Sequence, residues 1–232
     1  MCSQTLRVYE PITKNLKENL KLQKHSSLGE IMLEEVSEEI KQVRASGLSD
    51  LINVVALQFK LYIDLLHSFY KTHGRAPTFD EIQNHYPETK SFSIISQTFT
   101  AMIIEAFYFD YYHGKQSKGS AEKWSKQSPI KKFEQLSEVY LKVSNYTKTD
   151  IYVKLQDLNK VRKRWVHNQS TQIGKYKKNL NYLSPDGCIQ LLREFFEYFH
   201  THDKSCITAS LTFDALTYLQ IQYKGFSGPN AP

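Results

Sequence analysis

The sequence predicts an all-α fold, a helical bundle, from three observations. Glycine and proline are scarce, at 9 and 7 among 232 residues. Apolar residues recur at intervals of three and four over long segments. A hydrophobic content of 41% with 13% aromatic residues is typical of a chain with a substantial core. We expect the main bundle over residues 91–223, an N-terminal helical extension packed on it over 1–90, and a disordered tail over 224–232.

Two long helices are expected in the N-terminal extension. Ser27 and Glu30 form a capping-box pattern, and the apolar stripe behind them ends at Gly47. A denser stripe runs over residues 49–72 and is closed by Gly74, a residue type that adopts the left-handed conformation after a helix. We expect the second of these helices to be central to this half of the chain.

A short helix bracketed by prolines is expected next, because Thr78 and Glu81 repeat the capping pattern. The surrounding stretch FYKTHGRAPTFDEI (69–82) resembles the opening of winged helix-turn-helix repressors, so a DNA-binding regulator is one hypothesis. The next segment, 93–113, has the apolar pattern of a core helix and contains no arginine, lysine or asparagine to read bases. A turn followed by a capped helix accounts for the same residues.

Residues 93–113 are apolar on nearly every side, which predicts a buried central helix. Glu105 interrupts this surface, and a carboxylate among apolar neighbours must be paired or neutralised. We expect it to contact Arg162. The contact is expected whether Glu105 and Arg162 form a purely structural ion pair or Glu105 orients Arg162 for catalysis.

Serine–proline pairs mark the start of two later helices, as N-cap and first helical residue. The pair at 128–129 follows a polar connector over 114–127 and starts a helix whose apolar residues keep helical spacing from Ile130 to Val143. The pair at 184–185 precedes a helix over 186–202. A last helix is expected over 205–223.

The stretch LNKVRKRWVHNQS (158–170) carries the residues on which the functional argument depends. It continues a helix that we expect to begin at Thr149 or Asp150 and to end near Val166. Arg162 stands on an apolar face of this helix, in place of a core residue. The other members of that face are Ile151, Leu155, Leu158 and Trp165. An always-charged guanidinium there needs a carboxylate inside the fold or an anionic ligand in a cleft. His167 falls on the following turn, free to approach Arg162.

Basic side chains are concentrated around this motif. The chain has a net charge of +6, and residues 150–180 contain eight basic residues against two acidic ones, so this window carries the whole excess. A polyanion such as RNA suits such a surface, although a solvated basic face is the commoner reason for a basic run. The eight are Lys154, Lys160, Arg162, Lys163, Arg164, Lys175, Lys177 and Lys178.

Several other classes of protein are disfavoured. Cys2, Cys188 and Cys206 are far apart without a Cys-x-x-Cys pair, and on a helix His200 and His202 point in different directions. The sequence has no Gly-rich phosphate loop, Gly-x-Ser-x-Gly elbow or His-Glu-x-x-His motif. It also has no uninterrupted apolar run of about 18 residues. We expect a cytoplasmic protein with no metal, no cofactor and no membrane partner.

The Arg162-x4-His167 spacing, with the lone Glu105 on a preceding buried helix, resembles the signature of the HEPN domain, the higher eukaryotes and prokaryotes nucleotide-binding domain. That signature is an arginine, four to six residues and a histidine, often with asparagine directly after the arginine. The resemblance covers residues 91–202 and implies an HEPN-type helical bundle. Lys163 stands where the family often has asparagine, a departure from the signature at a position that commonly supports the geometry of the site.

The resemblance implies a homodimer whose two motifs face each other across a two-fold axis. Many members of the family are metal-independent endoribonucleases that act as toxins or in defence against phage, and others are noncatalytic. The implied catalytic residues are Arg162 on the scissile phosphate, His167 as general acid or base and Glu105 as the orienting group. RNA would be bound by Lys160, Lys163, Arg164, Lys175, Lys177 and Lys178.

Three hypotheses therefore stand. The leading one is an HEPN-type endoribonuclease, with RNA as its substrate and an antitoxin or other defence-system protein as a candidate partner. The second, motivated by Lys163, is a noncatalytic HEPN-like module that binds RNA, a nucleotide or a partner protein. The third is the DNA-binding regulator.

Overall fold

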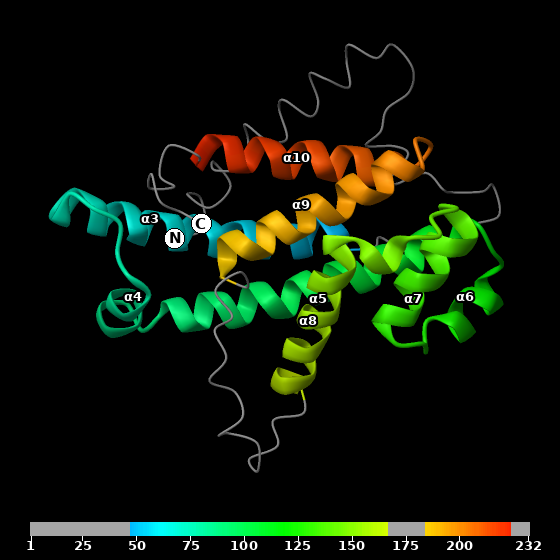
Figure 1. Cartoon of the computed structure of the whole chain (residues 1–232), viewed down its shortest axis with the longest axis horizontal. Coiled ribbons are helices and arrows are strands. Elements are labelled where there is room, and N and C mark those ends of the chain that lie inside the picture. Colours follow the sequence, from blue (N-terminus) through cyan, green and yellow to red (C-terminus); the bar gives the residue numbers. More distant parts are fainter. Residues whose placement is uncertain (1–46, 167–183, 224–232) are drawn as a thin grey trace. The chain divides into compact units, whose positions relative to one another are not determined.

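The computed structural model describes residues 47–166 and 184–223, drawn as ribbons in Figure 1. All regular structure within these ranges is helical, so the predicted all-α class is confirmed. The described residues belong to one compact unit that begins at Gly47. The helix expected after Ser27 and the tail expected after residue 223 lie outside the described ranges.

Helix α3 (Leu48–His73) is the long helix predicted in the N-terminal half. Gly47 and Gly74 flank it with φ angles of 64° and 67°, a left-handed conformation that glycine adopts without steric cost. The Gly74 N–H donates to the Tyr70 carbonyl at 2.8 Å and so satisfies one of the last carbonyl groups of the helix. The predicted closure by glycine is confirmed.

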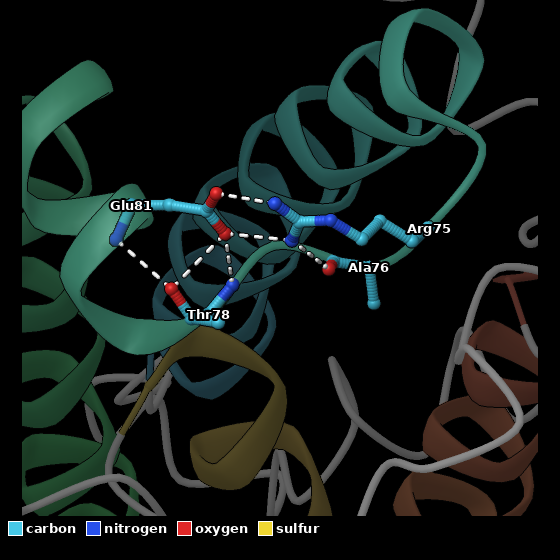
Figure 2. Close-up of polar contacts among 4 residues, drawn as sticks. All are labelled: Arg75, Ala76, Thr78 and Glu81. Carbon is cyan, nitrogen blue, oxygen red and sulfur yellow. Dashed lines mark hydrogen bonds and ion pairs between the residues drawn. The ribbon is translucent and has the colours of Figure 1, made fainter.

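Helix α4 (Phe79–His85) begins at the predicted capping box, formed by Thr78 and Glu81. Figure 2 shows that Arg75 joins this cap, with its Nη2 and Nη1 atoms 2.5 and 2.8 Å from the two Glu81 carboxylate oxygens. Hydrogen bonds from Arg75 and from the Thr78 backbone hold the pKa of the Glu81 carboxyl well below its usual range. Arg75 is therefore held by Glu81 in the turn between α3 and α4. This turn lies within the stretch 69–82 that resembles winged helix-turn-helix repressors.

Helix α5 (Thr89–His113) is the core helix of the bundle and packs against α3, α8 and α9. It is also, among the described helices, the one long and apolar enough to cross a membrane. Lys90 at its exposed start is its only lysine or arginine. With so few basic side chains, α5 is a poor candidate for a DNA-recognition helix.

An aromatic cluster joins α5 to α9 (Pro185–His202). The fully buried Phe107 ring makes edge-to-face contacts with three phenylalanines of α9, at centroid distances of 5.4, 5.1 and 4.8 Å. These partners are Phe195, Phe196 and Phe199. Such pairs add to the stabilisation that burial of the rings provides.

The polar connector expected over 114–127 contains a short helix, α6 (Lys118–Trp124), capped by the Ser117 hydroxyl. Trp124 anchors this helix by stacking on Tyr112, with ring centroids 4.2 Å apart and planes 6° from parallel. Its indole N–H donates to the Gln135 side-chain oxygen at 2.7 Å. With one large apolar residue, α6 lacks the repeated stripe by which longer helices are predicted.

Helix α7 (Pro129–Gln135) begins at Ser128 and Pro129 as predicted. The expected continuous helix is replaced after Gln135 by a π-helical turn, η2 (Leu136–Tyr140), in which the Leu141 N–H donates to the Leu136 carbonyl at 3.0 Å. The apolar spacing continues through this turn, so periodicity alone did not reveal the wider helix. A 3₁₀ turn, η3 (Tyr146–Lys148), then leads into α8 (Asp150–Val166).

Helices α9 and α10 (Ile207–Tyr223) run alongside each other after the predicted Ser184–Pro185 start of α9 (Figure 1). Asp203 in the turn between them accepts hydrogen bonds from the Tyr111 hydroxyl at 2.6 Å and from the Lys115 ammonium at 3.0 Å. Burial opposes ionisation of Asp203, but these bonds and those from Ser205 hold its pKa well below the usual range. The contacts tie the end of α5 to the α9–α10 turn.

Candidate functional site

Helix α8 positions Arg162 at the edge of its buried face. The predicted apolar stripe is confirmed by three buried side chains, those of Ile151, Leu155 and Leu158. The stripe continues with Val161, which is 2% exposed, whereas 37% of the Arg162 side chain is exposed. The expectation that Arg162 replaces a core residue is therefore wrong, because Val161, three residues after Leu158, occupies that position.

Glu105 of α5 contacts Arg162 as predicted. The Arg162 Nη1 atom donates to Glu105 Oε1 at 2.8 Å, across a separation of 57 residues in sequence. The helices α5 and α8 pack against each other, which brings the two charges together. The Glu105 charge on the apolar α5 helix is therefore paired with the Arg162 charge at the edge of the buried face of α8.

Lys132 of α7 is a second cation on the same carboxylate, and it was not predicted from the sequence. Its Nζ atom donates to Glu105 Oε2, so each carboxylate oxygen accepts from one cation. The Lys132 side chain is 5% exposed and Glu105 is 21% exposed. The Lys132 ammonium also lies 5.7 Å from the ring centre of Trp124. One sequence signal was present, because Lys132 stands four residues before the buried Leu136 and so shares its face.

The surroundings of Glu105 on the core side are apolar. Tyr108, one turn further along α5, is fully buried, and its pKa is raised by burial first and then by the Glu105 carboxylate. Leu155 and Leu158 of α8 and Ile104 of α5 line a small cavity of about 20 Å³ beside Glu105 and Arg162. Ion pairs beside such a low-dielectric interior interact more strongly than fully solvated ones.

An open cleft of about 500 Å³ lies on the solvent side of these charges. Its volume is in the range of sites that hold small molecules. Helices α3 and α5 contribute apolar side chains, the segment between α6 and α7 contributes polar ones, and Glu105, Lys132 and Arg162 contribute the charges. The other lining residues are Leu51, Met102, Ala106, Ser125, Gln127 and Pro129.

The predicted RNA-binding residues and His167 either lie away from the cleft or fall outside the described part of the structure. Lys160 is 73% exposed, pairs with Asp157 at 2.8 Å and does not line the cleft. Two residues along a helix correspond to about 200° of rotation, which separates Lys160 from Arg162. The side chains of Lys163 and Arg164 are outside the described part of the structure. So are His167, Lys175, Lys177 and Lys178, and the structure therefore does not place the second motif residue.

The histidine, cysteine and acidic side chains of the described ranges were compared with the geometry of metal sites and reactive thiols. No group of three or more histidine, cysteine, aspartate or glutamate side chains with metal-binding geometry occurs in residues 47–166 and 184–223. Burial raises the pKa of the Cys188 thiol to about 12 and also raises that of Cys206. Neither thiol is activated as a nucleophile, because activation requires a lowered pKa.

Comparison with known proteins adds no family: no family model matches the sequence, no curated protein matches it, and no solved structure matches it.

Proposed function

We propose that the protein is a metal-independent endoribonuclease of HEPN type, in which Arg162 binds the scissile phosphate of an RNA chain. The position of Arg162 is the observation that supports this most. Among the described residues its guanidinium donates one hydrogen bond, to Glu105, and it lines the open cleft. A guanidinium has five N–H donors in a planar fork that suits phosphate oxygens.

The proposed reaction uses the ribose 2′-hydroxyl as nucleophile. His167 removes its proton, the new bond from O2′ to phosphorus forms, and the bond from phosphorus to the 5′-oxygen of the next nucleotide breaks. A proton delivered to that oxygen completes a 5′-hydroxyl end, and the other fragment carries a 2′,3′-cyclic phosphate. Arg162 stabilises the charge that develops on the phosphate oxygens. The role of His167 rests on the sequence motif, because this residue lies outside the described ranges.

The composite site of this proposal is a homodimer of two such clefts, in a cytoplasmic protein that has RNA as substrate. An antitoxin or other defence-system protein belongs to the same proposal as a candidate partner. The basis for both is the motif resemblance. Light scattering of the purified chain, with and without RNA, measures the oligomeric state directly.

The proposal is tested by incubating the purified protein with an RNA oligonucleotide and with its all-2′-deoxy counterpart in excess EDTA. We expect the RNA to be cleaved to 2′,3′-cyclic phosphate and 5′-hydroxyl ends, and the deoxy strand to stay intact, because the nucleophile is absent from it. Gel electrophoresis with end analysis of the fragments checks both. Cleavage that needs added magnesium, or that also cuts the deoxy strand, would contradict this mechanism.

A noncatalytic RNA-binding module is the second candidate, and Lys163 in place of the family's frequent asparagine favours it. In that case the protein binds the same RNA oligonucleotide but leaves it intact, both in excess EDTA and with added magnesium. Binding then weakens steeply with salt, because each phosphate contact releases counterions.

A further inference from the structure

We infer that Lys132 is a positioning residue, which neutralises Glu105 and thereby leaves the positive charge of Arg162 for an anionic ligand in the cleft. The identification of that ligand as an RNA phosphate rests on the proposed function. The electrostatic role itself concerns three side chains that all lie within the described ranges.

The charge balance of this triad is the first argument. Arg162 and Lys132 each donate to a different oxygen of the Glu105 carboxylate. Two cations and one carboxylate leave one net positive charge. If Glu105 and Arg162 were alone, the pair would be neutral and would attract an anion only weakly.

The difference in burial between Lys132 and Arg162 indicates which cation neutralises Glu105 and which one faces the cleft. The exposed fraction rises from 5% at Lys132 through 21% at Glu105 to 37% at Arg162. The Lys132 ammonium is therefore the deep partner of the carboxylate, and it also faces the Trp124 ring. Arg162 is the member that solvent, and hence a dissolved anion, can reach.

The chemistry of the two cations supports the same division. An ammonium is a compact point charge without a planar fork, and that of Lys132 contacts one Glu105 carboxylate oxygen and the face of the Trp124 ring. A guanidinium in the cleft can hold Glu105 through one N–H and present others to a phosphate. Glu105 then orients Arg162 without cancelling the charge of the whole site.

The alternative is that Lys132 is only a stabilising ion-pair partner of Glu105. Paired variants distinguish the two roles. Lys132→Met removes the buried charge at similar volume, Glu105→Gln removes the carboxylate, and the double variant removes both and restores one net positive charge at Arg162. A purely structural role does not predict recovery of anion binding in the double variant.

The experiment is a titration of inorganic phosphate into protein labelled with ¹⁵N-arginine, following the Nε–Hε resonance of Arg162, which is assigned with Arg162→Lys. We expect Lys132→Met to weaken phosphate binding by about fivefold or more, since loss of one hydrogen-bonded charge changes affinity on that scale. Glu105→Gln should bind at least as tightly as wild type. The double variant should return to within about twofold of wild type, as expected when the same net charge is restored.

Lys154→Met is the matched control, because Lys154 of α8 pairs with Glu194 at 2.6 Å and does not line the cleft. It should leave phosphate binding at Arg162 unchanged. Circular dichroism and thermal unfolding establish that each variant is folded. If Lys132→Met fails to fold, Glu105→Gln decides the question on its own, because weaker binding than wild type would overturn the inference.

Three other results would also overturn it: wild-type affinity in Lys132→Met, no recovery in the double variant, or an Arg162 resonance that phosphate does not shift in the wild-type protein. RNA cleavage is measured separately. The expected phosphate pattern without any RNA cleavage would contradict the ribonuclease proposal and leave the role of Lys132 standing.

Discussion

Replacing Arg162 by alanine will reduce RNA cleavage by about 100-fold or more and leave the protein folded. The loss follows because removal of one donor that stabilises transition-state charge has an effect of this size. The fold persists because Glu105 keeps its second partner, Lys132, and is not left as an unpaired buried charge. Initial cleavage rates and thermal unfolding curves measure the two effects independently.

Lys154→Ala is the matched control for this prediction, since it removes one positive charge from the same helix outside the cleft. It should retain most of the activity. Arg162→Lys should fall between wild type and alanine, because it keeps the charge and loses the planar fork. A folded Arg162→Ala variant that cleaves RNA at the wild-type rate would show that Arg162 does not bind the reacting phosphate.

The largest loss of stability is expected from Phe107→Ala. This side chain is 1% exposed and contacts the rings of Phe195, Phe196 and Phe199 on α9. Truncating a buried phenylalanine lowers the free energy of unfolding by about 3–5 kcal/mol, through lost burial and the remaining cavity. In a domain of this size that corresponds to a melting temperature lower by roughly 10 °C or more.

Phe109→Ala tests whether burial is the cause, because Phe109 lies two residues away on α5 and is half-buried. Its truncation should lower the melting temperature by clearly less than that of Phe107. Differential scanning calorimetry of the two variants decides the point. Equal destabilisation would mean that the α5–α9 aromatic cluster is not the dominant contact of the core.

Helix boundaries were predicted well where local chemistry sets them. The left-handed glycine after α3, the Thr78–Glu81 capping box of α4 and the serine–proline start of α7 each depend on residues a few positions apart. The structure of such a short segment follows from its own sequence. Helix α6 and the π-helical turn η2 were not predicted, because one tryptophan anchors the first and the apolar spacing passes unchanged through the second.

The candidate site was predictable in part for a similar reason. A lone Glu105 and a lone Arg162 on apolar helical surfaces must each find a partner, and the simplest solution was their mutual contact. Lys132 could not be deduced in the same way, because the chain has many lysines and the burial of this one depends on the packing of α7 against other helices. That packing is a long-range property, and it also determines which of the two cations faces solvent.

The central claim, an RNA-cleaving site built on Arg162 and His167, is tested most directly by cleavage of an RNA oligonucleotide in excess EDTA by the wild-type protein and by His167→Ala. We predict rapid cleavage by the wild type and none by the variant, with both proteins folded and binding the RNA equally, since His167 transfers protons in the proposed reaction. Cleavage by folded His167→Ala at the wild-type rate, or no cleavage by the wild type unless magnesium is added, would contradict it.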